Sequence, residues 1–335
     1  MFCVRGNISV AILVATILLP TFAVSGTLVN STTDYHQGDP SQAEGQVTIT
    51  FTAVDKNKSV TTLKKDDIRL SADGVTQEIR NVRQQTDRPA SIAILIDTSA
   101  SQETLLAGAK LAAQAFLETV VSSRDQVAVV TFAEKETIQQ PLTRDRNRLR
   151  AAIGRAKFDP PPGYTGGGVI IKGPSVRQDH LTPGSTAIWD TLWMTCENIF
   201  ISAEPNTRHA IILFSDGEDS SSKLKMKTVV ERAIRDDVAV FSIGIADQRF
   251  GSNKAVLKQL SDRTGGRAFF PKSGDDVNNI FLGVNEELRS QYSVTFTPND
   301  KSSHNPFHKV RIELSNPELR KMELHLAYRD GYYSR

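Results

Sequence analysis

Side chains with oxygen donors occur on three loops where the sequence pattern changes, and such donors suit a metal ion. Asp97, Ser99 and Ser101 alternate directly after an apolar run. Ser215-Asp216 directly follows a second apolar run, and Ser185-Thr186 stands at the beginning of a helical pattern. Two carboxylates balance the charge of a divalent cation, and hydroxyl oxygens complete its shell without adding charge. Such donors favour Mg²⁺, with Mn²⁺ or Ca²⁺ as alternatives, over zinc or copper.

The elements that must hold these side chains are strands and helices that alternate along residues 88–290. The first run, 91–96, is continuously apolar, as expected of a strand covered on both faces of a parallel sheet. Ligands of such sheets bind beyond the carboxyl ends of the strands, where the candidate loops lie. We predict an α/β fold with a doubly wound, mostly parallel sheet and helices on both faces. The predicted strands are 91–96, 127–132, 210–214, 238–245 and 267–270, and the predicted helices are 105–120, 146–156, 186–200, 229–234, 254–264 and 277–288.

Residues 45–86 and 291–335, on either side of this domain, alternate between apolar and polar and are predicted to be β-structure. Asp73-Gly74 is a hairpin signal between two of these strands. Each flank has roughly forty residues, which is small for an independent domain. We therefore predict one small β-sandwich whose chain is interrupted by the α/β domain. Its six predicted strands are 47–54, 68–72, 76–82, 292–297, 308–314 and 322–326.

Residues 1–25 have the pattern of a secretory signal. Arg5 precedes a long apolar run, and Ala23-Val24-Ser25 supplies the small residues of a cleavage site. An uncleaved anchor is the alternative, because the apolar run is barely long enough to span a bilayer. Residues 26–44 are predicted to be a disordered linker. We expect an exported protein in the periplasm, on the cell surface or secreted into the medium, with no membrane span after cleavage.

Composition excludes several other classes of protein. The chain has 335 residues, and 40 Lys and Arg against 38 Asp and Glu give a net charge of +2. This balance argues against a nucleic-acid binder, whose basic surface normally shows in the sum. Cys3 and Cys196 are the two cysteines, too few for a disulfide framework or a Cys-based zinc site. Cys196 lies in an apolar helical stretch and is expected to be a buried hydrophobic residue.

The chain resembles the von Willebrand factor A domain and its metal-ion-dependent adhesion site, over roughly residues 88–290. The family motif is D-x-S-x-S, a Thr and an Asp on three loops, which match Asp97, Ser99, Ser101, Thr186 and Asp216. The resemblance implies that the three hydroxyls contact the metal and that the two carboxylates bind it directly or through water. It also implies one open position for a Glu or Asp of an unidentified partner protein.

The flanks resemble those of exported bacterial proteins related to this domain. The matching stretches are 63–68, Asp73-Gly74-x-x-Gln77, 292–298 and 331–333. The function of that group is poorly defined, so this resemblance does not narrow the ligand.

Other interpretations of the candidate residues stay open. Ser99, Ser101 and Thr186 could cap helices instead, or the domain could be a structural envelope component without metal. A metal-dependent hydrolase is a third alternative, but no base accompanies the serines, and neither a G-x-S-x-G elbow nor a P-loop occurs. We therefore expect a monomeric protein-binding module of the adhesion type and not an enzyme.

Two neighbouring features have less specific interpretations. Glu218 and Asp219 follow Asp216 and are interpreted as a solvated acidic loop. The Pro- and Gly-rich segment 160–183 is too long for a routine connection and leads into the Thr186 loop. It either shapes partner specificity or is a tolerated insertion.

Overall fold

The computed structural model describes residues 45–55, 58–59, 63–86, 88–160, 164–166, 169–170, 185–245, 253–271, 274–299, 306–322 and 324–334. The predicted signal sequence (1–25), the predicted linker (26–44) and most of the 160–183 segment lie outside these residues. Within the described ranges, no helix combines the length and apolarity needed to cross a membrane.

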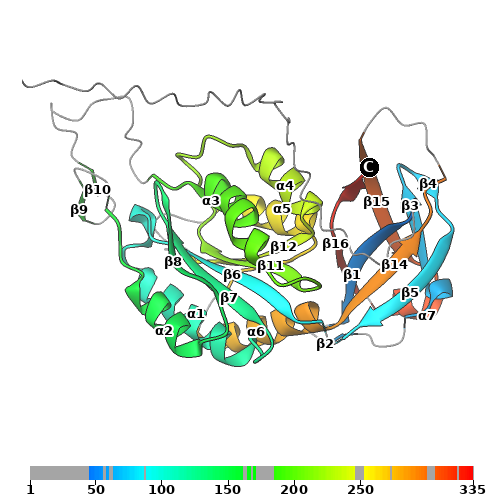
Figure 1. Cartoon of the computed structure of the whole chain (residues 1–335), viewed down its shortest axis with the longest axis horizontal. Helices are drawn as coiled ribbons and strands as arrows, with labels where there is room; N and C mark the ends of the chain where they lie inside the picture. The colour runs from blue at the N-terminus through cyan, green and yellow to red at the C-terminus, as the bar shows by residue number, and fades with distance from the viewer. Residues whose placement is uncertain are drawn as a thin grey trace, which may run out of the picture. The chain divides into compact units, whose positions relative to one another are not determined.

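A mixed sheet of six strands forms the centre of the α/β domain (Figure 1). The strand order is β13-β12-β11-β6-β7-β8, with all neighbours parallel except β7 and β8. The predicted doubly wound, mostly parallel sheet is therefore confirmed. The strands are β6 (Ala90–Asp97), β7 (Gln126–Phe132), β8 (Glu136–Thr143), β11 (Arg208–Ser215), β12 (Val238–Gly244) and β13 (Ala268–Phe269).

The edge strand β8 is the element of this sheet that the sequence pattern does not predict. Its residues are exposed or half-buried and include Pro141, so no buried face imposes an apolar alternation. Its pairing with β7 is irregular between Val127 and Val130. Proline and irregular pairing are typical of an edge strand.

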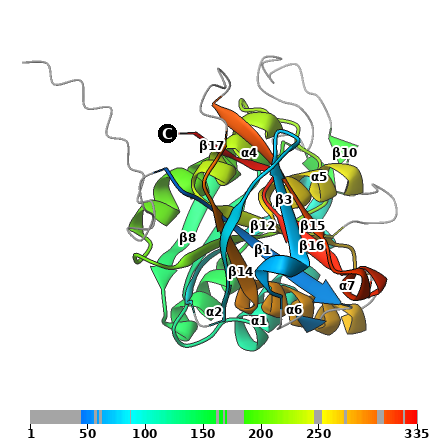
Figure 2. The same ribbon diagram turned by 90° about the vertical axis from the view of Figure 1, so that its right-hand side faces the viewer.

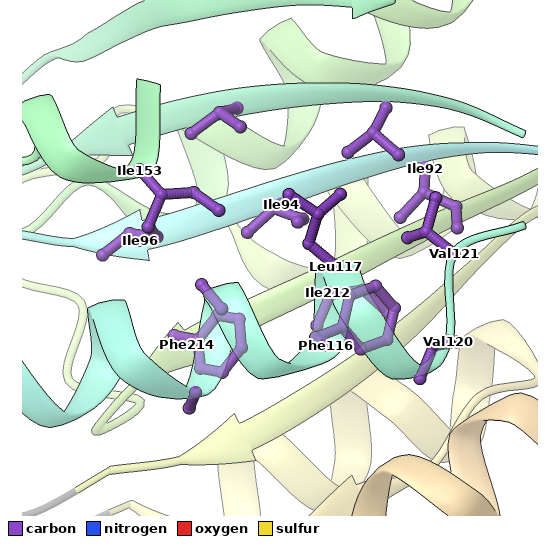
Figure 3. Close-up of a cluster of buried hydrophobic side chains, with 14 of the residues drawn as sticks. Ile92, Ile94, Ile96, Phe116, Leu117, Val120, Val121, Ile153, Ile212 and Phe214 are labelled. Carbon is purple, nitrogen blue, oxygen red and sulfur yellow. The ribbon is translucent and has the colours of Figure 1, made fainter. Parts of the chain in front are cut away.

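Helices cover both faces of this sheet because alternate residues of β6 point in opposite directions. Ile92, Ile94 and Ile96 pack in a cluster with α1, α2 and α6, part of which is shown in Figure 3. Ala93 and Leu95 belong to a second cluster with α3, α4 and α5. The helices are α1 (Leu106–Thr119), α2 (Arg146–Arg155), α3 (Ile188–Met194), α4 (Met226–Arg235), α5 (Lys254–Thr264) and α6 (Gly274–Arg289). A π-helical stretch (Thr195–Ile199) and a 3-10 turn (Phe200–Ser202) continue α3.

Strands from before and after the α/β domain combine in two antiparallel sheets (Figure 2). One has the order β16-β1-β14-β5, with β2 beside β1, and the other has the order β17-β15-β3-β4. Phe51 of β1 stacks on Tyr292 of β14 with ring centroids 5.3 Å apart, and both belong to the core that the two sheets share. The strands are β1 (Val47–Asp55), β2 (Lys58–Ser59), β3 (Ile68–Ala72), β4 (Val75–Thr76), β5 (Ile79–Gln85), β14 (Gln291–Phe296), β15 (Phe307–Leu314), β16 (His325–Tyr328) and β17 (Gly331–Tyr333).

The described residues hold three more strands here than the six predicted, because β2 and β17 were not predicted and one predicted strand is divided. Asp73 and Gly74, with φ of 49° and 82°, make the predicted hairpin turn between β3 and β4. Gln77 then interrupts the strand, with its Nε2 donating to Val75 O and its Oε1 accepting from Asn299 N. As a result β4 pairs with β3, whereas β5 pairs with β14 in the opposite sheet.

The last predicted strand of the sandwich also begins later than expected. A short helix, α7 (Pro317–Lys321), precedes it, and the strand β16 starts at His325 and not at Met322. Asn316 accepts a hydrogen bond from Glu318 N at 3.0 Å, and Pro317 occupies the first helical turn. Both residues are typical of a helix start. The chain therefore forms this helix first, and the strand that the apolar–polar alternation predicted from Met322 begins only at His325.

Candidate metal centre

The first candidate loop begins where β6 ends at Asp97. Asp97 is buried, its Oδ1 accepts from Ser99 N at 3.0 Å, and its Oδ2 accepts from Ser215 Oγ at 2.7 Å. Ser99 is extended, and a 3-10 turn (Ala100–Gln102) follows it. This turn brings Ser99 Oγ and Ser101 Oγ to 3.3 Å from each other. The alternating spacing therefore gathers the three side chains at one strand end.

The third loop lies against the first. Asp216 directly follows β11 and is buried, and its Oδ2 accepts from Gln102 Nε2 at 3.1 Å. Its Oδ1 accepts from Glu218 N at 3.0 Å. Gly217 has a φ of +84°, and a Cβ there would lie 2.8 Å from Leu257 Cγ, so the turn after Asp216 requires glycine.

The second loop is attached to the third through the backbone of Thr186. Thr186 is buried, and its N–H donates to Ser220 Oγ at 3.0 Å. Its carbonyl accepts from the N–H groups of Ser220 and Ser221 at 2.9 and 3.2 Å. Thr186 is thus fixed to the segment that begins with Asp216, while the Asp216 side chain contacts the first loop.

The Ser99 side chain does not cap the helical segment that follows it, and Thr186 is not the capping residue of α3. Ser99 precedes the 3-10 turn, but its side chain makes no capping hydrogen bond. The residue that precedes α3 is Ala187, not Thr186. The first N–H groups of α3, from Ile188 and Trp189, are satisfied instead by Asp219 Oδ1 at 2.8 and 3.4 Å.

Burial and the negative charge of Asp216 raise the pKa of Asp97 to about 7, and the hydrogen bonds from Ser99 and Ser215 offset part of this rise. Among the described residues, no Lys, Arg or His forms a hydrogen bond or ion pair with either carboxylate. No group of three His, Cys, Asp or Glu assembles there either. The candidate donors, two carboxylates and three hydroxyls, are all oxygen, which matches the preference of hard divalent cations.

The interpretation of Asp219 as part of a solvated loop is wrong, whereas Glu218 is exposed as expected. Asp219 is half-buried, caps α3 and accepts from Ser222 Oγ at 2.5 Å. Burial raises its pKa, and these hydrogen bonds offset part of the rise. Gln102 was not identified from the sequence, although it directly follows Ser101.

Two further expectations concern Cys196 and the 160–183 segment. Cys196 is buried and unpaired, and burial raises the pKa of its thiol, in agreement with a hydrophobic role. The described part of the 160–183 segment forms a small hairpin of β9 (Tyr164–Gly166) and β10 (Val169–Ile170). Tyr164 OH donates to Glu103 Oε2 at 2.6 Å, which attaches the hairpin to the residues after Ser101.

Solved structures with a similar fold are distant in sequence. A von Willebrand factor type A protein from Catenulispora acidiphila is 14% identical over 82% of this chain and 71% of its own, with a TM-score of 0.47. An aerotolerance-related membrane protein from Bacteroides fragilis is 16% identical over 59% of this chain and 98% of its own, with a TM-score of 0.43. Proximal thread matrix protein 1 from the mussel byssus is 20% identical over 62% of this chain, with a TM-score of 0.43. This chain covers 49% of that mussel protein, about half of its length.

The family assignment rests on family models and not on these distant likenesses. Comparison with curated proteins finds no match. Two models, both of the von Willebrand factor type A domain, match residues 92–219 and 175–282. Together they span residues 92–282, more than half of the chain, and they coincide with the six-stranded sheet and its helices. The chain is therefore a member of the von Willebrand factor type A domain family.

Proposed function

We propose that this protein holds a divalent cation at Asp97, Ser99, Ser101, Thr186 and Asp216 and uses it to capture an acidic side chain of a partner protein. Domains of this family typically act as interaction modules and not as enzymes. The observation that carries the proposal is the pair of buried carboxylates, Asp97 and Asp216, which repel each other on neighbouring loops, with the hydroxyls of Ser99 and Ser101 gathered on the first loop. Neither carboxylate has a basic partner among the described residues. A bound cation would neutralise this pair.

The donor set favours Mg²⁺, with Mn²⁺ or Ca²⁺ as alternatives. When bound, the cation would supply a Lewis-acidic centre that attracts a carboxylate from outside. The surrounding residues of this chain hold the donors in position. Ser215 fixes Asp97 Oδ2 at 2.7 Å, and Gln102 fixes Asp216 Oδ2 at 3.1 Å. Such supporting hydrogen bonds commonly determine metal affinity.

The proposal includes export, with residues 1–25 as the signal sequence. It is supported by the pattern of Arg5, the apolar run and the small residues that precede Gly26. Cleavage would leave Cys196 as the cysteine of the mature chain, and Cys196 is buried in the α/β core. N-terminal sequencing of the protein recovered from outside the cytoplasm tests this directly. An intact Met1 in the exported protein would contradict cleavage.

Calorimetric titration of residues 26–335 with Mg²⁺ and Mn²⁺ tests the metal centre. The expected result is saturable binding at one site, lost in the double variant Asp97→Asn/Asp216→Asn. Glu218→Gln is the matched control, because Glu218 is an exposed acid on the same loop. Binding should survive in this control. Equal binding in the double variant and the parent would contradict the assigned ligands.

Capture of an acidic group requires a second experiment. Immobilised poly-glutamate should retain the protein in the presence of Mg²⁺ and release it when the metal is chelated. Poly-glutamine is the matched surface, since it keeps the length and polarity of the side chain without the charge. Retention on both surfaces, or retention that survives chelation, would contradict the proposed recognition of a carboxylate.

A further inference from the structure

A small cavity lies at the opposite end of the α/β sheet from the candidate metal centre. It has a volume of about 40 Å³ and borders the amino ends of β11 and β12 on one side. On the other side it borders β1, β14 and β16 of the β-sandwich. We call it the Arg208 cavity, and the lining residues that matter here are Thr52, Arg88, Arg208, Asp237, Gly265 and Arg329.

Three polar side chains that line the Arg208 cavity have a buried atom without a hydrogen-bond partner in the described structure. These atoms are Thr52 Oγ1, Arg208 Nε and Arg329 Nε. Thr52 and Arg208 are only 3% and 5% exposed, so bulk water does not reach them freely. Buried donors left without an acceptor are costly, and here three of them border one space.

The charge around the Arg208 cavity is positive. Arg88, Arg208 and Arg329 line it, against the single lining carboxylate Asp237 among the described residues. Arg329 Nη1 already pairs with Asp237 Oδ1 at 2.8 Å. The Arg208 guanidinium donates to the carbonyls of Leu288 and Gln85 and forms no ion pair in the described part of the chain, although the more distant carboxylate of Asp125 offsets part of its charge.

Arg208 keeps its charge despite burial. Burial lowers the pKa of Arg208 to about 10, with Arg88 and Arg289 contributing to the decrease, so the guanidinium is protonated at neutral pH. A charged group that is buried without a directly paired counter-charge is unfavourable, whereas a small anion beside it supplies both charge and an acceptor.

We propose that the Arg208 cavity binds one compact inorganic anion of the chloride class. The cavity volume suits a single small ion or a few water molecules and is too small to enclose an organic acid as large as gluconate. Such an anion accepts hydrogen bonds from Thr52, Arg208 and Arg329 and balances the excess of guanidinium groups. Because Thr52 belongs to β1 and Arg208 to β11, the anion bridges the β-sandwich and the α/β domain.

Thermal unfolding in matched salts measures this binding. The chain is unfolded with a chelator present, in sodium chloride or in sodium gluconate of equal ionic strength, so that the metal centre does not contribute. At chloride several times above its dissociation constant, the unfolding midpoint should rise by about 2–4 °C relative to gluconate. Gluconate is too large for the cavity and serves as the reference anion.

Two variants locate the effect. Thr52→Val keeps the shape of the side chain and removes one donor, and Arg88→Gln removes a charge at the half-buried rim. Each should lose at least half of the chloride-dependent rise. Thr131→Val is the matched control, a buried strand threonine that does not line the cavity, and it should keep the full rise.

Bromide replaces chloride in crystals and is located by its anomalous scattering. A bromide peak between Thr52, Arg208 and Arg329 is the expected result. Equal unfolding midpoints in chloride and gluconate, an unchanged rise in both Thr52→Val and Arg88→Gln, or water alone at this position would each overturn the proposal. All of these outcomes are independent of metal binding at Asp97 and Asp216.

Discussion

Asp125 and Arg289 lie 164 residues apart in the sequence and form an ion pair. The pair lies beside the points at which the chain enters and leaves the α/β domain. Asp125 is buried, and its Oδ1 also accepts from the N–H of Ala90, the first residue of β6, at 2.8 Å. Arg289 is the last residue of α6, directly before the chain returns to the β-sandwich. One carboxylate therefore holds both ends of the inserted domain together.

The stability contributed by Asp125 should depend on pH. Burial alone raises the pKa of Asp125, but the hydrogen bonds from Arg289, Ala90 and Ser122 hold it below its usual value. The contribution is therefore present above about pH 4 and is lost as the pH falls through the lowered pKa.

Asp125→Asn tests this dependence, because it leaves Arg289 without its counter-charge. We expect a loss of about 3 kcal/mol in the free energy of unfolding near neutral pH. The difference should shrink as the pH falls through the lowered pKa of Asp125, because the parent carboxyl is then protonated as well. Urea unfolding over a pH series from neutral into the acid range measures it, and an equal difference throughout would contradict the assigned ion pair.

Gln102 should control the affinity of the metal centre without binding the metal itself. Its amide donates to Asp216 Oδ2 at 3.1 Å and to Ser101 Oγ at 3.4 Å. Gln102→Met keeps the length of the side chain and removes both hydrogen bonds. We expect the Mg²⁺ dissociation constant to rise by about 10-fold, as is usual for the loss of a residue that orients metal ligands. An unchanged constant in calorimetry would show that Asp216 is positioned without Gln102.

Asp219 should matter for stability, whereas its neighbour Glu218 should not. Asp219→Ala removes the acceptor for the first N–H groups of α3 and should cost about 1 kcal/mol. Glu218→Ala is the matched control, since that side chain is exposed, and it should change stability by less than about 0.5 kcal/mol. Equal effects of the two variants in urea unfolding would rule out the capping role.

Two glycine substitutions should have effects of opposite sign. Gly217 has a φ of +84° and no room for a Cβ, so Gly217→Ala should destabilise the protein by more than about 1 kcal/mol. Gly154 lies in α2 with no atom within 4 Å of an added Cβ. Gly154→Ala should stabilise the protein by about 0.5 kcal/mol. Thermal unfolding compares them, and a neutral Gly217→Ala would mean that the loop after Asp216 can relax.

Apart from β8 and the β9–β10 hairpin, the sequence alone determined the order of the helices and strands in the α/β domain. The run 91–96 is buried on both faces, so all of its residues but Ser91 are apolar, and this short continuous run predicts β6 directly. The spacing of the apolar residues in 254–264 likewise predicts the helix α5. The positions of the candidate ligands at strand ends follow, because parallel strands place their carboxyl ends at one edge.

Only the tertiary structure decided features that depend on residues far apart in the chain. The amide of Gln102 meets Asp216 114 residues later, and Asp219 caps a helix that precedes it by about 30 residues. Similarly, β8 has no buried face, and β5 leaves its neighbour β4 to join the opposite sheet. The periodicity of apolar residues indicates which face of a segment is buried. It does not indicate which distant residues that segment will contact, because those contacts form only when packing brings separate segments together.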